Sequence, residues 1–283
     1  YDPNPEFAHR LCMHLTNYSV NKHSKEFQEN QDAEDDDQGH KWSLSALLRH
    51  LQGEGHDTVE LMARIKDVIL KTLLCAEPYV SDALGQAASW SSHDRCNCFE
   101  LLGFDILIDE YLRPWLIEVN MSPSLSCGSP LDHAIKSTLI SDLLTLVGIH
   151  TLDWPTMDKL SKGAGRSKKS KIISSYLDKE AEIVDALVKQ RVGVDVSTLS
   201  REHRVIVRDS YLEEQRMGNF ERLFPTEDSR SYDGFFKVRR PLNSMLHRML
   251  FGKVSPSPVV GFRPKETFLY DNTRPLEDPE AAE

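Results

Sequence analysis

The sequence lacks most of the features that would assign it to a familiar class at once. It has no apolar run near the ~18–20 residues that a membrane span needs, and no signal peptide opens it. It has no glycine-rich loop of the P-loop kind, which excludes that type of phosphate site. An initiator Met is missing, and Tyr1-Asp2-Pro3 does not resemble a natural start. We therefore expect a fragment that begins inside a larger domain and has no membrane partner.

Cysteine is sparse, and its spacing does not fit a metal site. The five cysteines are Cys12, Cys75, Cys96, Cys98 and Cys127, and no Cys-x-x-Cys pair occurs. Cys96 and Cys98 stand too close together for a usual zinc knuckle, and the second pair that such a site needs is absent. Reduced thiols are the better interpretation, which favours a cytoplasmic location.

An excess of positive charge is also missing, because 34 basic residues face 44 acidic ones, for a net charge of -10. This balance argues against a nucleic-acid partner, since such proteins bind largely through contacts to phosphates. The charge is unevenly distributed, however. Residues 26–37 hold seven acids, whereas residues 159–171 hold six bases and no acid. The basic run has two interpretations, a flexible linker or an exposed arm that contacts an anionic partner.

The chain contains both strand and helix patterns, which predicts an α/β (α+β) fold. Residues 98–107 and 115–121 are typical of two strands, each largely apolar. A tight polar turn at residues 109–111 lies between them, and Pro114 stands at the edge of the second strand. Together these segments predict a β-hairpin.

Helical patterns precede and follow the predicted hairpin. The first helix begins at a capping box, Asp57 to Glu60. Its expected apolar face consists of Val59, Met62, Ile65, Ile69 and Thr72 or Leu73. Ser129 and Pro130 are preferred first residues for a second helix, which would end at Gly148. Further helices are expected at residues 174–191, 197–217 and 241–251.

Three oxygen-bearing side chains are expected to converge on the hairpin. Glu118 and Asn120 lie two residues apart in one strand, so they share a face of it. Asp105 stands in the apolar middle of the other strand, roughly opposite residues 116–118. Two carboxylates and an amide suit Mg²⁺, which prefers hard oxygen ligands together with water and substrate phosphates. The alternative is that these are the solvent-facing positions of a half-exposed strand.

Four longer blocks carry a resemblance to a known family. They are HLTNYSVNK (14–22), GHKWSLSALL (39–48), FELLGFDILID (99–109) and RPWLIEVNMSPSL (113–125). Over residues 1–150 the chain resembles the tubulin tyrosine ligase-like family, whose members are ATP-grasp ligases. Within that family, the chain resembles the glutamylase branch most. This resemblance is carried by YSVNK, SPSL and PLDHAIKS (130–137), and more weakly by MGNFERLFPT (217–226).

The resemblance implies a role for each side chain that falls on a motif. The acid of GFD and the acid and amide of EVN would hold the catalytic magnesium, which implies Asp105, Glu118 and Asn120. Thr16 and Asn17 would lie against the nucleotide. Free glutamate would be contacted by Tyr18, Ser19, Lys41 and Lys136. Judged from the residues alone, Thr16 and Asn17 could instead be turn formers. Tyr18 could be a core aromatic, and Lys41 and Lys136 could be solvated surface lysines.

The activity that the resemblance implies is ATP-dependent amide ligation. Free L-glutamate would be joined to a glutamate side chain in the acidic C-terminal tail of tubulin. ATP would first phosphorylate the acceptor carboxylate, and the amino group of glutamate would then displace the phosphate, with Mg²⁺ neutralising charge. The alternatives are a catalytically incomplete microtubule-binding module and a related ligase that adds glycine or tyrosine. The expected location is the cytoplasm and its cytoskeleton, including the cilium or basal body.

Four segments are predicted along the chain. Residues 1–150 would be the C-terminal half of the catalytic domain, 151–172 a basic linker or an arm for the microtubule surface, 173–252 a helical extension and 253–283 a disordered tail. In the family, the lysines that clamp the phosphates and the strand that binds adenine lie before HLTN, which starts here at residue 14. We therefore expect the chain alone to bind ATP weakly and to be inactive.

Overall fold

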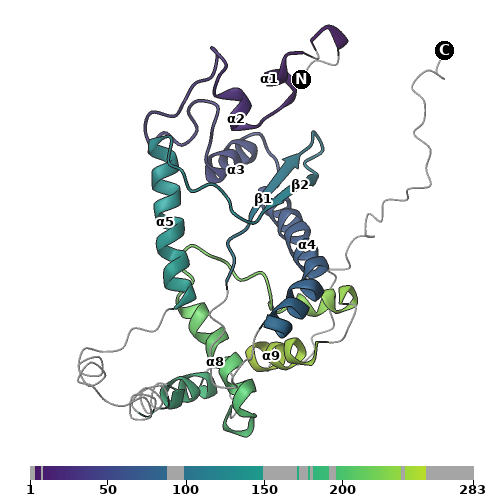
Figure 1. The fold of residues 1–283 in the computed structure, drawn as a ribbon, viewed down its shortest axis with the longest axis vertical. Helices are drawn as coiled ribbons and strands as arrows, with labels where there is room; N and C mark the ends of the chain where they lie inside the picture. Colours follow the sequence, from purple (N-terminus) through teal and green to yellow (C-terminus); the bar gives the residue numbers. More distant parts are fainter. Residues whose placement is uncertain are drawn as a thin grey trace, which may run out of the picture.

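The structure, a computed structural model, describes residues 4–7, 9–87, 99–148, 171, 178, 181–190, 196–236 and 240–252. It is a helix-rich fold with a small two-stranded sheet (Figure 1), so the predicted mixture of helices and strands is confirmed. Its labelled elements are η1 (Pro5–Phe7), α1 (Leu11–His14), α2 (Tyr18–Asn21), α3 (Leu44–Gly53), α4 (Thr58–Ala87), β1 (Gly103–Ile108), β2 (Pro114–Asn120), α5 (Pro130–Val147), η2 (Val196–Thr198), α8 (Arg201–Gln215), η3 (Ser229–Phe235) and α9 (Pro241–Phe251). Residues 181–190 are also helical.

Two predicted segments cannot be compared with this fold. The linker or arm at 151–172, apart from residue 171, and the tail at 253–283 lie outside the described residues. Within the described part of the chain, no helix is both long enough and apolar enough to cross a membrane.

The long helix α4 begins where the sequence predicts, but only part of its predicted apolar face is buried. The Asp57 side chain accepts hydrogen bonds from the N–H groups of Val59 and Glu60, both at 3.0 Å, which caps the helix. The buried residues are Leu61, Ile65, Leu70 and Leu74, whereas Val59 is 80% exposed. Of the predicted apolar face, Ile65 is buried, Met62, Ile69 and Thr72 are half-buried, and Val59 and Leu73 are exposed, so the prediction is only partly confirmed. The reason is that α4 contacts α3, β2 and η3, so no single stripe faces one partner.

The predicted hairpin is confirmed, with β1 and β2 paired antiparallel. Hydrogen bonds close its turn, from Asp109 N–H to the Arg113 carbonyl at 3.1 Å and from Leu112 N–H to the Asp109 carbonyl at 2.9 Å. Leu112 adopts a left-handed φ of 57°, as the last residue of a three-residue hairpin loop requires. β2 packs against α4, which lies next to the hairpin (Figure 1).

Helix α5 begins and ends at the residues that the sequence predicts. The Ser129 hydroxyl accepts a hydrogen bond from Asp132 N–H at 3.2 Å, and Pro130 occupies the first turn. Gly148 ends the helix with φ 63°. A Cβ at Gly148 would lie 2.3 Å from the Arg216 guanidinium, so glycine allows both the left-handed cap and the close approach of a later segment.

The helices after residue 180, called here the extension (181–252), have a hydrophobic core of their own. Its buried members are Val184, Val188, Val196, Val207, Met245 and Met249. Full burial of such a side chain contributes about 1.5–3 kcal/mol. The extension is therefore stabilised in large part by packing within itself.

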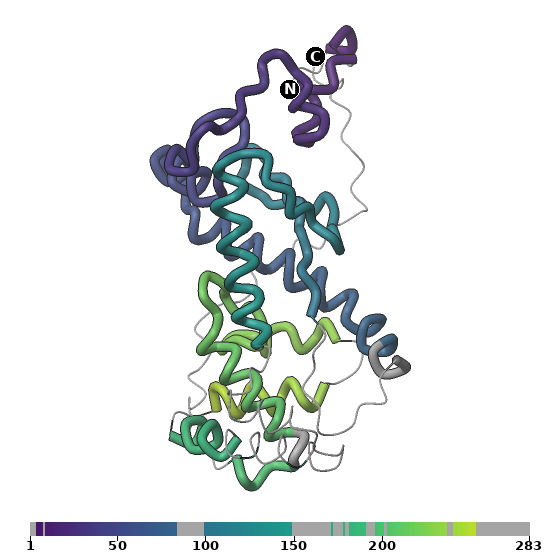
Figure 2. Tube along the Cα trace, turned by 60° about the vertical axis from the view of Figure 1, so that its left-hand side comes forward, coloured from purple at the N-terminus to yellow at the C-terminus, as the bar shows by residue number. Residues whose placement is uncertain are grey.

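Polar contacts attach the extension to α4 and α5. Its contacts with α4 are Glu221 with Lys66 at 2.6 Å, Tyr232 with Asp67 at 2.8 Å, and Arg240 with Glu77 at 2.7 Å. On α5, Asp142 accepts hydrogen bonds from the backbone and side chain of Asn219, at 2.9 and 2.8 Å. Figure 2 shows the extension near the C-terminal end of α5 and alongside α4, which it contacts between Lys66 and Glu77. It thereby links the two long helices of the preceding segment.

Candidate active site

Strand pairing brings Asp105, Glu118 and Asn120 together. The register places Asp105 opposite Glu118 and Gly103 opposite Asn120. Asn120 Nδ2 donates a hydrogen bond to Glu118 Oε1 at 3.1 Å. The register shifts directly after Asp105, and such a β-bulge bends a strand and re-aims its side chains. Both carboxylates are exposed, so the face that carries them is open to a ligand.

The two carboxylates create a local excess of negative charge. Although Asp105 is exposed, its partial desolvation by the surrounding strands, followed by the neighbouring Glu118 carboxylate, raises its pKa above the usual value. A bound cation would relieve this repulsion. Within the described ranges, no group of three or more His, Cys, Asp or Glu side chains is placed to hold a metal ion. The donor set on the hairpin is instead two carboxylates and an amide, which fits Mg²⁺ because that ion retains water and phosphate ligands.

Asp109 holds the turn of this hairpin in place. Its carboxylate accepts hydrogen bonds from the N–H groups of Tyr111 and Arg113, both at 2.9 Å, from Arg113 Nε at 2.7 Å and from Trp115 Nε1 at 3.0 Å. Burial alone would raise the pKa of Asp109, but the hydrogen bonds from Trp115 and Arg113 hold it well below its usual range. The sequence marks Asp109 only as a turn residue, whereas the structure makes it the clamp of the hairpin.

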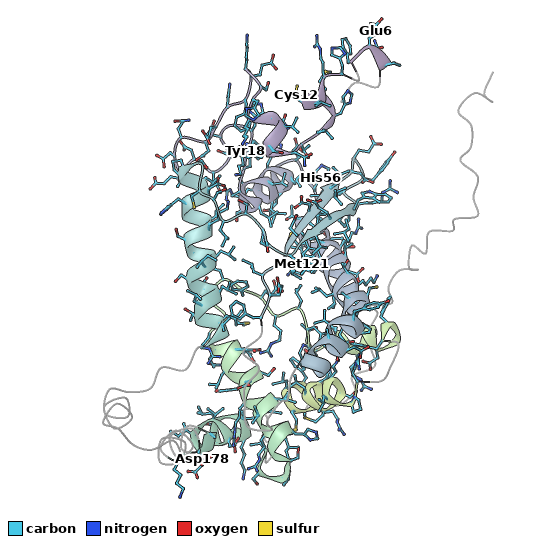
Figure 3. The ribbon with its side chains drawn as sticks, viewed as in Figure 1. Glu6, Cys12, Tyr18, His56, Met121 and Asp178 are labelled. Carbon is cyan, nitrogen blue, oxygen red and sulfur yellow. The ribbon has the colours of Figure 1, made fainter. Side chains whose placement is uncertain are left out.

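A second group of predicted residues lines a cavity beside α2, where Tyr18 is labelled in Figure 3. The cavity has a volume of about 230 Å³ and is lined by Cys12, Leu15, Thr16, Tyr18, Asn21, Phe27, His40 and Lys41. The structure thus brings Thr16, Tyr18 and Lys41 together. Asn17 and Ser19 are exposed neighbours that do not line the cavity, and Asn17 serves as the N-cap position of α2.

Lys41 and Lys136 approach a common carboxylate, Asp132. Lys41 Nζ lies 2.7 Å from Asp132 Oδ1, and Gly128 N–H donates to Asp132 Oδ2 at 3.2 Å. Lys136 Nζ donates to the Ser126 carbonyl. Burial alone would raise the pKa of Asp132, but the hydrogen bond and charge of Lys41, helped by Gly128 N–H and the charge of Lys136, hold it below its usual value. The two predicted lysines therefore meet around an acid that sequence analysis missed.

The sequence contains only a misleading signal for Asp132. It stands three residues after the N-cap Ser129, which is the position of the acid in a capping box and predicts a bond within the helix start. One carboxylate oxygen does accept a hydrogen bond close to the helix start, from Gly128 N–H, but the other reaches Lys41, a residue 91 positions earlier in the chain. No local pattern encodes such a contact.

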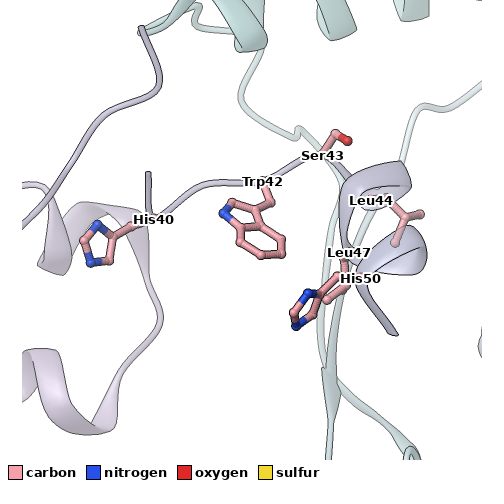
Figure 4. Close-up of a pocket in the computed structure, with 6 residues that line it drawn as sticks. All are labelled: His40, Trp42, Ser43, Leu44, Leu47 and His50. Atoms are coloured by element: carbon pink, nitrogen blue, oxygen red, sulfur yellow. The ribbon is translucent and has the colours of Figure 1, made fainter. Parts of the chain in front are cut away.

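A larger cavity adjoins the first one at His40. Its volume is about 590 Å³, and it is lined by His40, Trp42, Ser43, Leu44, Leu47 and His50 (Figure 4). Trp42 Nε1 donates to the Gly39 carbonyl at 3.0 Å, and the Trp42 ring packs edge-on against His50. None of the predicted site residues lines this cavity. It therefore lies beside the predicted ligand contacts and not among them.

Comparison with known proteins identifies the family. Residues 1–155 match the tubulin-tyrosine ligase family. The chain is 38% identical over 266 residues to tubulin polyglutamylase TTLL5 of Mus musculus, which covers 89% of this chain and 20% of that protein. It is 38% identical over 232 residues to tubulin polyglutamylase ttll-5 of Caenorhabditis elegans, covering 75% of this chain and 31% of that protein. It is 36% identical over 270 residues to tubulin monoglutamylase TTLL4 of Homo sapiens, covering 86% and 21%.

The match therefore extends through the hairpin, the Tyr18 cavity and the start of α5, while the chain spans only 20% to 31% of the length of these relatives. Because the family match covers more than half of the residues of this chain, the chain belongs to the tubulin-tyrosine ligase family.

Proposed function

We propose that the full-length protein containing this chain is an ATP-dependent ligase that joins free glutamate to glutamate side chains of the tubulin C-terminal tail. The observation that carries this proposal is the convergence of Asp105, Glu118 and Asn120 on one open face of the hairpin. It is supported by relatives that are named tubulin polyglutamylase and tubulin monoglutamylase.

Asp105, Glu118 and Asn120 are the residues that would hold Mg²⁺. The ion, when bound, would neutralise charge on the phosphates of ATP. The protein's own contribution is position, because Asp109 fixes the turn and strand pairing fixes the two acids opposite each other. Thr16 and Asn17, at the start of α2, would lie against the nucleotide.

The proposed reaction has two steps. The terminal phosphoryl group of ATP is transferred to the acceptor carboxylate, and ADP leaves. The amino group of free glutamate then attacks the acyl carbon, phosphate leaves with the bonding electrons, and the amine loses a proton as the amide forms. Tyr18, Ser19, Lys41 and Lys136 would orient the incoming glutamate, with the lysines as counter-charges for its carboxylates.

The lysine pair favours glutamate over glycine or tyrosine as the added amino acid. Lys41 and Lys136 both lie near Asp132, so two positive charges are gathered at one end of α5. Glycine and tyrosine carry one carboxylate, and glutamate carries two. Even with Asp132 between them, the two lysines leave an excess of one positive charge, so the site binds glutamate more favourably than glycine or tyrosine, which have no net charge.

Mass spectrometry tests the proposal. The full-length protein is incubated with ATP, Mg²⁺, a tubulin-tail peptide and one of glutamate, glycine or tyrosine. We expect a mass gain equal to one or more glutamate residues with glutamate alone. Addition of glycine or tyrosine would reassign the substrate, and no addition of any of the three would favour a microtubule-binding module without catalysis.

A further inference from the structure

Asp132 is a charged helix residue that is buried. It is 8% exposed and lies in the first turn of α5. An ionised carboxylate persists at such a position only when it is paired and hydrogen-bonded. One of its oxygens accepts from Gly128 N–H at 3.2 Å, and the other accepts from Lys41 Nζ at 2.7 Å. Both oxygens are therefore used, and one of them binds a predicted substrate contact.

Lys41 is held from a second direction as well. The ring of Tyr18 lies below its ammonium group, with 4.7 Å from Nζ to the ring centroid. An ammonium group carries three N–H donors, so a lysine bound to one carboxylate and one aromatic face keeps a donor for a further ligand. Lys41 and Tyr18 line the 230 Å³ cavity, whereas Asp132 does not. Asp132 thus stands behind the lysine and away from the cavity wall.

The charges in this cluster sum to a positive value that one anionic ligand would neutralise. Lys41, Lys136 and Asp132 together carry a net charge of one positive unit, which balances the net charge of one negative unit that free glutamate carries at neutral pH. Without Asp132, the flexible four-carbon stem of Lys41 would be free to sample many rotamers, and ordering it on a ligand would cost entropy. A buried acid behind the lysine avoids that cost because the ammonium is already in place.

We propose that Asp132 is a positioning residue that fixes the Lys41 ammonium where it meets a carboxylate of the incoming free glutamate. This inference rests on the proposed function, since it assigns to Asp132 the support of a substrate contact in that same site. It predicts that Asp132 acts on the binding of glutamate and leaves ATP binding and the transfer steps unchanged, because Lys41 contacts the amino acid and not the reacting phosphate.

The test compares steady-state kinetics of the full-length protein and its Asp132→Asn variant on a tubulin-tail peptide. The amide keeps the shape of the side chain and one acceptor oxygen but removes the charge. We expect the KM for glutamate to rise about 10-fold, while kcat and the KM for ATP stay within about 2-fold. Asp142→Asn is the matched control, because it makes the same change on the same helix at an acid that binds Asn219. It should leave the KM for glutamate unchanged.

A double-mutant cycle separates positioning from a general structural effect. In a Lys41→Gln background the group that Asp132 positions is gone, so Asp132→Asn should change the KM for glutamate by no more than about 2-fold. Equal effects with and without Lys41, or an unchanged KM in folded Asp132→Asn protein, would overturn the inference. If Asp132→Asn does not fold, Asp132→Glu, which shifts the charge by one methylene, is judged by the same criteria. Failure of the unchanged protein to add glutamate would contradict the proposed function and this inference with it.

Discussion

In the extension, Val188 and Val207 are 0% exposed, whereas Ile117 and Met121, which flank the acid and amide of β2, are 62% and 71% exposed. The extension closes its apolar side chains into a core of its own. The hairpin instead leaves one face open and is ordered by strand pairing and by the hydrogen bonds of Asp109. The predicted ligand contacts of the hairpin therefore lie where apolar packing contributes little and hydrogen bonds set the geometry.

Substitutions in the two regions should therefore have different consequences. A change inside the extension should alter the free energy of unfolding, while a change on the hairpin or at the Tyr18 cavity should alter substrate use at nearly constant stability. Helix α4, which packs against the hairpin, is joined to the extension by a few polar contacts, such as that of Tyr232 with Asp67. Three stability measurements, given in order of decreasing expected effect, test this division.

The largest effect is expected for Val207→Asp in α8. An unpaired carboxylate at a position that is 0% exposed should lower the free energy of unfolding by about 4 kcal/mol, because it must be desolvated without a partner. Urea unfolding followed by circular dichroism measures the loss. Val80→Asp in α4 is the matched control, since Val80 is 55% exposed and should tolerate the change. Similar losses at both positions would contradict the self-contained core of the extension.

A smaller effect, with a defined pH dependence, is expected for Asp132→Asn. The pKa of Asp132 is lower in the folded chain than its usual value of 3.8, so the unfolded chain binds more protons in acid and stability rises with pH. The unchanged chain should be more stable than the variant by about 1 kcal/mol at neutral pH. This advantage should persist down to about pH 5 and shrink as the pH falls through and below the usual value.

Urea titrations of both proteins at several pH values would measure that difference. An advantage that stayed constant across the acidic range would show that the charge of Asp132 is not what stabilises the fold. An advantage that grew on acidification would have the wrong sign for a carboxylate stabilised as its anion.

The smallest effect is expected where the extension meets α4. Tyr232→Phe removes the hydroxyl that donates to Asp67 at 2.8 Å and should cost about 0.5 kcal/mol, because Asp67 loses one partner but keeps Lys71 at 2.7 Å. Tyr111→Phe is the control, because Tyr111 is 67% exposed in the hairpin turn. Urea unfolding would compare them. Identical stabilities for the two variants would mean that the contact between the extension and α4 contributes nothing.

Elements fixed by short-range chemistry could be predicted from the sequence. The hairpin follows from two apolar strands around a polar turn, and its register put Asp105 opposite Glu118 as expected. The start of α5 follows from Ser129 and Pro130, and its end from Gly148. In each of these cases the determining residues lie close together in the chain, so spacing and residue type are sufficient.

Features that depend on distant segments could not be predicted. The buried face of α4 was only partly predicted because its partners α3, β2 and η3 come from different parts of the chain. The pair between Lys41 and Asp132 joins residues 91 positions apart, and Asp132 has the sequence context of a helix-capping acid. Family resemblance made Lys41 a predicted substrate contact, but only the folded chain shows what holds its ammonium in place.

The link between the hairpin acids and glutamate ligation is tested most directly by the intact mass of a tubulin-tail peptide. The full-length protein and its Glu118→Gln variant are each incubated with ATP, Mg²⁺ and glutamate. We expect the unchanged protein to add glutamate and the variant to be slower by at least about 100-fold, with an unchanged unfolding midpoint because Glu118 is exposed. Glutamate addition by the folded Glu118→Gln variant at the rate of the unchanged protein would contradict a role for the hairpin acids in catalysis.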